Sequence, residues 1–392
     1  MLSARLGAYA TRSSQALLDI HFIFHPIHTH HHLLSLSDAQ IHGDRDRTIF
    51  PFLTAAAPRI RSLILMSPPI LDCKFCSSVL VTCISNCTPG ILTEVSIEAP
   101  IILDRNLTID TPNNEGLVKS NNDAFWLPIT VLQLSRSHIP WESKAYHGLT
   151  EFRVDIYDTI KLSVLVAIFQ CSPQLRLFEL QCYEDLVHDD SLLAPIPLDN
   201  LEILVLVGVQ DVWLGLILQL IAPGLKPLSL SISNPYEHDT QFSCREELQR
   251  FIARSNVTRF CANDFKTYSQ IANVLSLLPT VQVLALDSFS CHDIAENDTE
   301  SSSLIIDTLY VIRSRGLSSF AWAAIERLVQ RHQVQKLIFW WSDFRDLELG
   351  EAGGERVPDN LYTVCPVVKI LPDDQPNPTE EWYFRGLHNY FS

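Results

Sequence analysis

The stretch Pro279-Thr-Val-Gln-Val-Leu-Ala-Leu286 decides the fold, because its pattern recurs along the chain. A proline is followed by apolar residues two, five and seven positions later, with more variable residues between them. The same pattern begins at Pro58, Pro173 and Pro223. One short unit repeated in this way is the sequence signature of proteins that stack supersecondary units.

Looser copies of the unit bring the total to twelve, at a mean spacing of about 28 residues, within or just above the range of leucine-rich repeats. Seven of the twelve have a proline within three residues upstream, and 22 prolines in 392 residues would place far fewer there by chance. Proline at this point ends a helix and sets the entry to an extended segment. The looser copies start at Leu92, Ile129, Leu149, Leu201, Val257, Ile306, Val334 and Val367.

Helical periodicity marks the rest of the unit. Apolar residues recur on one helical face in two stretches, Thr267–Leu278 and Cys244–Arg254. Each unit is therefore expected to form a helix, a turn and a short strand, and a lone unit cannot bury its apolar side. The sequence predicts an α/β fold: an irregular leucine-rich-repeat-like solenoid with a curved parallel sheet and outer helices.

Three regions follow from the extent of the repeat. Residues 1–47 carry no clear strand or helix phase and are expected to be an atypical, poorly ordered leader. Residues 48–371 form the solenoid, and residues 372–392 are a C-terminal tail. The stretch 342–360 is acidic and contains glycine, which is typical of a surface loop.

The segment Ile203–Ile221 is apolar and nearly long enough to cross a membrane. Asp211 in its middle would cost about 3 kcal/mol at the centre of a bilayer. The repeat explains the same residues as a strand over 201–207 followed by a helix. No membrane contact is expected.

Charge and cysteine content limit the partners. The formal net charge of -16 describes an acidic surface, which repels nucleic-acid phosphate and anionic lipid, so neither is an expected partner. Ten cysteines in a chain of this length do not form a dense disulfide framework, and no secretory signal opens the chain. A cytoplasmic or nuclear location is expected.

No catalytic constellation is evident. With only 13 glycines, the chain has neither a G-x-G-x-x-G nor a Walker phosphate loop, and it lacks G-x-S-x-G and H-E-x-x-H. The triplet His188-Asp189-Asp190 and the stretch Gly350–Glu355 are each interpreted as surface loops. The chain is expected not to be an enzyme and to need no cofactor.

Four cysteines, Cys73, Cys76, Cys83 and Cys87, have a spacing that suggests a zinc site. On a helix they would form one narrow stripe spread over several turns, whereas a tetrahedral site needs ligands that converge. The preferred interpretation is a row of small buried residues, so no metal is expected; zinc stays the alternative.

Six histidines crowd the N-terminal region, at positions 21, 25, 28, 30, 31 and 32. Such a tract can hold a transition metal, and the simpler interpretation is a functionally neutral leader. Residues 1–18 contain Arg5 and Arg12, several serines and no acidic residue, so a mitochondrial transit peptide is an alternative. An altered start of the gene is another.

Three stretches resemble the repeat region of fungal F-box/leucine-rich-repeat proteins: Ser137–Leu149 (SHIPWESKAYHGL), Leu309–Val311 and Gln335–Trp341 (QKLIFWW). The resemblance covers about residues 48–371. It implies a substrate receptor of a cullin-type ubiquitin ligase, whose F-box helices dock a Skp-type adaptor. Residues 1–47 contain no F-box opening of the Leu-Pro-x-Glu kind, so the adaptor is expected only if an F-box is present. The asparagine ladder of regular repeats is also missing, since its positions hold Tyr183, Ser233 and Phe289.

The expected functional surface is the row of strand residues that alternate with the inward apolar ones. The row is mixed in charge, which suits an unknown protein partner on the concave face better than a polyanion. Trp340 and Trp341 are the expected aromatic anchors, although one of them is expected in the core. The other candidates are Arg61, Glu94, Gln133, Glu151, Arg153, Arg176, Glu179, Glu202, Lys226, Arg259, Gln282 and Lys336.

The expected function is therefore a non-enzymatic protein-interaction scaffold that resembles a ligase substrate receptor. A structural or assembly role with no link to ubiquitin is the alternative.

Overall fold

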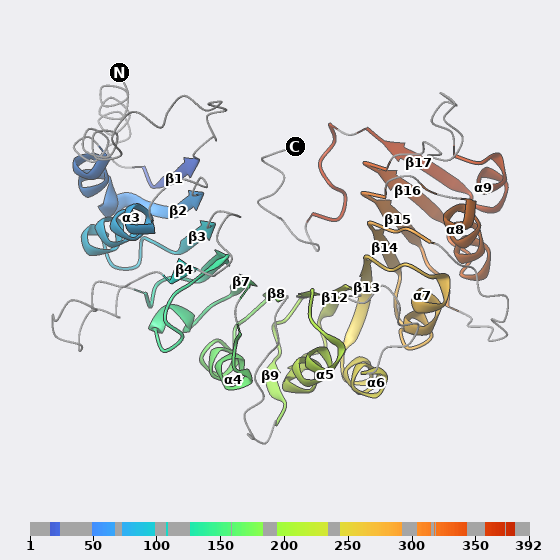
Figure 1. Cartoon of the computed structure of the whole chain (residues 1–392), viewed down its shortest axis with the longest axis horizontal. Helices are drawn as coiled ribbons and strands as arrows, with labels where there is room; N and C mark the ends of the chain where they lie inside the picture. The colour runs from blue at the N-terminus through green and yellow to red at the C-terminus, as the bar shows by residue number, and fades with distance from the viewer. Residues whose placement is uncertain are drawn as a thin grey trace. The chain divides into compact units, whose positions relative to one another are not determined.

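The computed structural model (Figure 1) describes most of the chain, with gaps in the sequence between the described ranges. The described residues are 16–23, 49–66, 73–98, 107–108, 126–157, 159–182, 194–233, 244–291, 304–314, 317, 319–342, 357–372 and 374–380. They form two compact units: unit 1 comprises residues 1–159 and 167–175, and unit 2 comprises residues 160–166 and 176–392.

The fold is mixed α/β, and thirteen of the described strands belong to a large parallel sheet. This part of the predicted fold class is confirmed. Twelve of the thirteen strands correspond to the twelve copies of the repeat. The thirteenth, β1 (Leu18–Ile23), lies inside residues 1–47, for which the sequence pattern gave no strand. Its apolar residues alternate as in the other strands, but no proline precedes it and no helical period accompanies it.

Unit 1 places its strands in the order β1-β2-β3-β5-β7, each parallel to its neighbour. Helix α3 (Cys73–Asn86) connects β2 to β3. This unit also contains a helical stretch over residues 49–56 and the short pair β4 (Leu107–Thr108) and β6 (Ser137–His138). The strands are β2 (Ile60–Met66), β3 (Glu94–Glu98), β5 (Val131–Ser135) and β7 (Glu151–Ile156).

In unit 2 the strands are also parallel, in the order β8-β10-β12-β13-β14-β15-β16-β17. Figure 1 shows α5 to α9 along one side of these strands. The strands are β8 (Leu177–Cys182), β10 (Ile203–Val207), β12 (Pro227–Ser233), β13 (Asn256–Asn263), β14 (Val283–Asp287), β15 (Thr308–Ile312), β16 (Lys336–Trp340) and β17 (Val367–Leu371). The helices are α5 (Asp211–Leu220), α6 (Arg245–Ala253), α7 (Tyr268–Leu275), α8 (Ser319–Arg331) and α9 (Asp359–Val364). Helix α4 (Leu162–Cys171) contains residues of both units, and a short pair joins β9 (Ile196–Leu198) to β11 (Ile221–Pro223).

The strand register lines up the apolar residues of successive units. In unit 2 the row that runs across the sheet is fully buried; it comprises Phe178, Leu204, Leu230, Phe260, Leu284, Leu309 and Leu337. Unit 1 has the equivalent row Leu63, Val95, Leu132 and Phe152. Because neighbours along a strand point to opposite faces, these rows place one face of the sheet against the helices and leave the other face for different contacts.

The two helices predicted from periodicity are confirmed as α6 and α7. Thr267 begins α7 with a capping box, in which its hydroxyl accepts from the Gln270 N–H while the Gln270 side chain accepts from the Thr267 N–H. The apolar segment Ile203–Ile221 forms β10 and α5, the strand and helix that the repeat predicted, and reaches the start of β11. Among the described residues, no helix is long and apolar enough to span a membrane.

Two copies of the repeat are shifted from their predicted register. Leu225 was expected to point inward but is 92% exposed, and Leu228 takes the buried position instead. The register of β12 against β13 shifts between Leu228 and Ser229, so this unit is one residue shorter than its neighbour. In the last unit Val367 is 39% exposed, and Cys365 takes the buried position before β17.

In five repeats of unit 2, the residue that follows the strand has a left-handed backbone conformation. Its φ lies between 47° and 68° at Gly208, Asp264, Ser288, Arg313 and Trp341. Four of these five are not glycine, and side chains make this conformation costly. Hydrogen bonds to the next strand offset the cost: the Ser288 N–H donates to the Ile312 carbonyl at 3.0 Å, and the Arg313 N–H to the Trp340 carbonyl at 3.1 Å. The chain therefore leaves the sheet at the same level after each of these strands.

A serine hydroxyl serves where a regular repeat has asparagine. Ser314 lies three positions after the last inward residue of β15, and its hydroxyl accepts from the Phe289 N–H at 3.1 Å and donates to the Ile312 carbonyl at 3.2 Å. Ser342 is equivalent in the next unit, and its hydroxyl donates to the Val311 carbonyl at 3.2 Å. A short hydroxyl can therefore link adjacent units without the amide ladder.

The shifted register predicts a difference between two leucines three positions apart. Leu228→Ala should lower the free energy of unfolding by about 2–5 kcal/mol, because it leaves a cavity in the core. Leu225→Ala is the matched control and should change it by less than about 0.5 kcal/mol. Urea unfolding followed by circular dichroism measures both. Equal losses, or a larger loss for Leu225→Ala, would show that the register of β12 is wrong.

Candidate functional site

The candidate site is the face of the sheet opposite the helices, which we call the open face of each unit. In unit 1 it carries the side chains that alternate with the Leu63 row, and in unit 2 those that alternate with the Leu204 row. The predicted surface residues fall into three different positions relative to it. The structure brings some of them together and separates others.

Seven predicted residues lie within strands on an open face. In unit 1 they are Glu94, Gln133, Glu151 and Arg153, and Gln133 pairs in register with Arg153. In unit 2 they are Glu179, Arg259 and Lys336. Of these, Glu179 is buried. The face is therefore mixed in charge in both units, as the alternation of residues predicted.

Four predicted residues lie one position before a strand, at the edge where the strands begin, rather than within the strands as the sequence analysis expected. They are Arg176, Glu202, Lys226 and Gln282. Glu202 receives hydrogen bonds from the Arg176 guanidinium and the Lys226 ammonium, each at 2.9 Å. These bonds, that from Arg176 first, lower the pKa of Glu202. Gln282 lines a separate cavity of about 390 Å³ with Asn256, Thr258 and Thr280.

Arg61 lies in β2 of unit 1, at the point where the register of β2 against β1 shifts. Its guanidinium donates to both carboxylate oxygens of Asp19 in β1, at 3.1 and 2.6 Å. The hydrogen bond to Asp19 raises the pKa of Arg61. Arg61 therefore joins two strands at the surface, and both side chains stay largely exposed.

Buried charges in unit 1 occupy the carboxyl ends of the strands on the open face. Glu98, Ser135 and Asp155 are register neighbours across β3, β5 and β7. The Ser135 hydroxyl donates to Asp155 at 3.1 Å, and the Arg136 Nε lies 3.9 Å from the same carboxylate. Burial raises the pKa of Asp155 from 3.8 to about 6, and burial also raises the pKa of Glu98.

One guanidinium thus faces two buried carboxylates. The Arg136 guanidinium also donates to the Tyr157 hydroxyl at 3.1 Å and stacks over that ring. Within the part of the chain that the structure describes, Glu98 Oε2 and Asp155 Oδ1 have no hydrogen-bond partner. The ionised forms of Glu98 and Asp155 are therefore costly.

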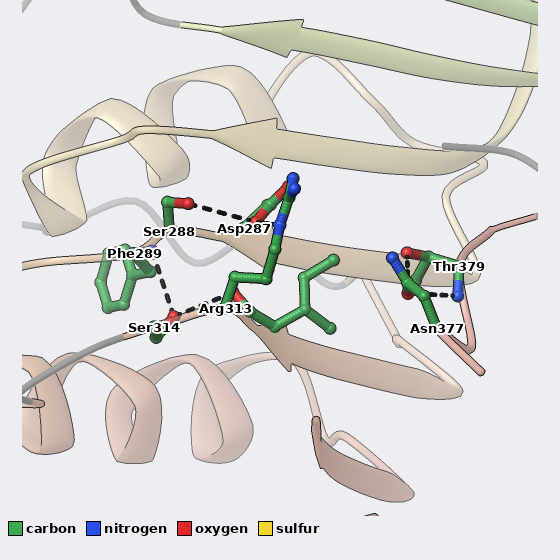
Figure 2. Close-up of polar contacts among 8 residues, drawn as sticks. Asp287, Ser288, Phe289, Arg313, Ser314, Asn377 and Thr379 are labelled. Carbon is green, nitrogen blue, oxygen red and sulfur yellow. Dashed lines mark hydrogen bonds and ion pairs between the residues drawn. The ribbon is translucent and has the colours of Figure 1, made fainter. Parts of the chain in front are cut away.

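The equivalent position in unit 2 holds a closer ion pair (Figure 2). Asp287 is fully buried at the end of β14, and the Arg313 guanidinium binds it through both nitrogens that face it, one of them at 2.9 Å. The Ser288 hydroxyl donates to the same carboxylate at 3.3 Å. Asp264 lies near this pair, and burial raises its pKa. The pair therefore links two successive units on the open face.

The sequence analysis did not identify these ion pairs. Asp155, Asp287 and their arginines lie one or two positions beyond the apolar pattern, and each arginine meets a carboxylate about one repeat away. A charged residue directly after the last inward residue of a strand was the only available signal. That signal occurs in Phe-Arg-Val-Asp155 and in Leu-Ala-Leu-Asp287.

An apolar patch lies on the open face of unit 2. Its buried members are Cys261, Ala285, Ile312 and Trp340, with Tyr310 and Trp341 packed against them. Trp340 is only 7% exposed, and the Trp341 ring meets it at a centroid distance of 5.9 Å. The expectation that one tryptophan is buried is met by Trp340, although it packs on the open face and not against the helices.

The described residues offer little for nucleophilic or metal chemistry. Burial raises the pKa of the Cys83 and Cys244 thiols to about 12, which keeps them protonated. Cys83 lies in α3 and is buried. Cys87 follows the last residue of α3, and its thiol donates to the Ile84 carbonyl at 3.2 Å. No group of three or more potential metal ligands occurs among the described residues. The side chains of Cys73 and Cys76, His25 to His32, His188 to Asp190 and Gly350 to Glu355 lie outside the described residues.

Asp155 makes a testable prediction about pH. Its pKa is raised in the folded state, so its protonated form contributes stability below pH 4, and that contribution is lost as the pH rises through about 6. The free energy of unfolding of the native chain should therefore fall by about 2–3 kcal/mol between pH 4 and pH 7 relative to Asp155→Asn. Chemical unfolding of both proteins at several pH values measures the difference.

Glu151→Gln is the control, because Glu151 lies in the same strand but is partly exposed, with Arg153 at 3.4 Å. The Glu151→Gln variant should change the free energy of unfolding by less than about 1 kcal/mol. A difference between Asp155→Asn and the native chain that does not change with pH would contradict the burial of an ionisable Asp155.

Comparisons with known proteins add no family. No protein-family model matches the chain, and no curated protein matches it. The functional argument therefore depends on the residues of the two open faces.

Proposed function

We propose that this chain is a non-enzymatic scaffold that binds another protein through the open face of its parallel sheet. The repeats would form an irregular leucine-rich-repeat-like solenoid with a curved sheet and outer helices. The observation that carries the proposal is the composition of the open face. It combines side chains of both charges with an apolar patch that contains Trp340 and Trp341.

The charge of this face differs from that of the whole chain. Of the predicted residues that lie within strands on an open face, three are basic and three are acidic, whereas the chain has 29 basic and 45 acidic residues. A mixed surface around aromatic side chains is typical of protein interfaces, in which Trp, Tyr and Arg supply most of the binding energy. Nucleic acid and anionic lipid would require a continuous basic surface. The partner we propose is therefore a protein.

The absence of catalysis, metal and cofactor is part of the proposal. High thiol pKa values remove two candidate nucleophiles, Cys83 and Cys244. The ion pair of Arg313 with Asp287 neutralises a carboxylate that an enzyme could otherwise use as a base. A cytoplasmic or nuclear location fits these protonated, unpaired cysteines.

The resemblance to F-box/leucine-rich-repeat proteins suggests which process the scaffold serves. The chain would present substrate to a cullin-type ubiquitin ligase, and a Skp-type adaptor would bind only if the protein carries an F-box. A structural or assembly role without ubiquitin is the second candidate. Both use the open face, so the partner recovered distinguishes them.

Affinity purification of the native chain with mass spectrometry should recover a protein that depends on the open face. Lys336→Glu reverses a charge on that face and should weaken recovery about tenfold or more. Arg250→Glu is the matched control, because Arg250 is an exposed residue of α6 on the helix side. The Arg250→Glu variant should recover the same amount of the partner protein as the native chain does.

Recovery of a Skp-type adaptor and a cullin would support the ubiquitin role, and their reproducible absence would leave the structural role. A partner that both variants retain equally, or that only Arg250→Glu loses, would contradict binding through the open face.

A further inference from the structure

The apolar patch on the open face of unit 2 is buried although the helices lie on the other side of the sheet. Cys261 and Ala285 are fully buried, as is Ile312 at the end of β15. A sheet face that meets water normally carries polar side chains. Partly buried apolar residues pack against them: Ile203, Val283, Tyr310, Trp341 and Leu371.

The segment Asp374–Glu380, which follows β17, reaches this patch at Trp340. In Figure 1 the chain turns back after β17 toward the strands of unit 2, and Figure 2 shows Asn377 and Thr379 as a hydrogen-bonded pair apart from the group of Asp287 and Arg313. The Trp340 indole N–H donates to the Gln375 carbonyl at 2.9 Å. Thr379 is fully buried. The segment thus occupies the same face that we propose for a partner.

The segment has the character of a peptide ligand. Pro376 and Pro378 restrict the backbone, and two turns shape the segment: the Gln375 N–H donates to the Pro372 carbonyl and the Glu380 N–H to the Asn377 carbonyl, each at 3.0 Å. Asn377 preorganises the end of the segment, because its side-chain oxygen accepts from the Thr379 N–H at 2.9 Å and from the Thr379 hydroxyl at 2.7 Å. No residue of 374–380 adds a strand to the sheet. Recognition therefore uses a backbone carbonyl and a small side chain.

We propose that the open face of unit 2 is a binding site for a turn-forming, proline-containing peptide, and that residues 374–380 occupy this site within the chain. The inference rests on the proposed function and names its partner class and its regulation. A partner would supply a carbonyl for the Trp340 indole and a small buried side chain in place of Thr379. It would have to displace the chain's own segment, whose attachment gives it a high effective concentration.

The test uses the full chain and a fluorescent peptide with the sequence of residues 372–380. Thr379→Asp places a charge in a fully buried position and should release the segment. The peptide should bind this variant at least about tenfold more tightly than the native chain, measured by fluorescence anisotropy. Adding Trp340→Phe to Thr379→Asp removes the indole donor and should abolish the gain.

A peptide in which threonine is replaced by aspartate is the control and should not bind. Equal affinity of the original peptide for the native chain and Thr379→Asp, or binding to neither, would overturn the inference. If a partner still depends on Lys336 in the purification experiment, the proposed function would stand without it.

A measurement on the native chain covers the case in which Thr379→Asp does not fold. Hydrogen exchange of the Trp340 indole, followed by nuclear magnetic resonance, should show opening at a lower free energy than global unfolding. Excess peptide should change the exchange rate. Exchange that occurs only through global unfolding would overturn the inference, because the segment would then be a fixed part of the core.

Discussion

The burial of one apolar row across the parallel strands is the constraint on which the rest of the structure depends. A single strand exposes its inward leucine or phenylalanine, and only in-register neighbours and a covering helix remove it from water. In unit 2 the row from Phe178 to Leu337 is buried throughout. Each such side chain contributes about 1.5–3 kcal/mol when buried, which favours stacking in this register.

The same register determines what the open face can carry. Because one set of side chains in each strand packs against the helices, the alternate set lies on the open face at the same level in every repeat. Left-handed residues end the strands together, so an arginine that follows one strand meets a carboxylate near the end of the neighbouring strand. Asp287 with Arg313 and Asp155 with Arg136 are the two results. The carboxyl ends of the strands thus hold buried ion pairs, while Arg176, Glu202 and Lys226 form an exposed group at the other end.

Much of the fold could be predicted from the sequence, because proline, apolar spacing and helical period repeat together. The failures have physical causes. Leu225 and Leu228 compete for one position, and only the register shift against β13 selects Leu228. The candidate site was predicted in part: alternation identified Arg153 and Lys336, but the hydrogen-bond acceptor for the Trp340 indole comes from residues 374–380, which lie outside the repeat. Ion pairs between units depend on three-dimensional register, which a single pattern does not contain.

Disulfide cross-linking tests the register most directly. Thr308 and Lys336 are paired on the open face of adjacent strands, at a separation of about 4.8 Å that suits a disulfide. Oxidation of a chain with Thr308→Cys and Lys336→Cys should give the cross-linked peptide in mass spectrometry. The same experiment with Thr308→Cys and Gln335→Cys should give little, because Gln335 precedes β16. A cross-link only in the second pair would contradict the in-register rows on which the open face depends.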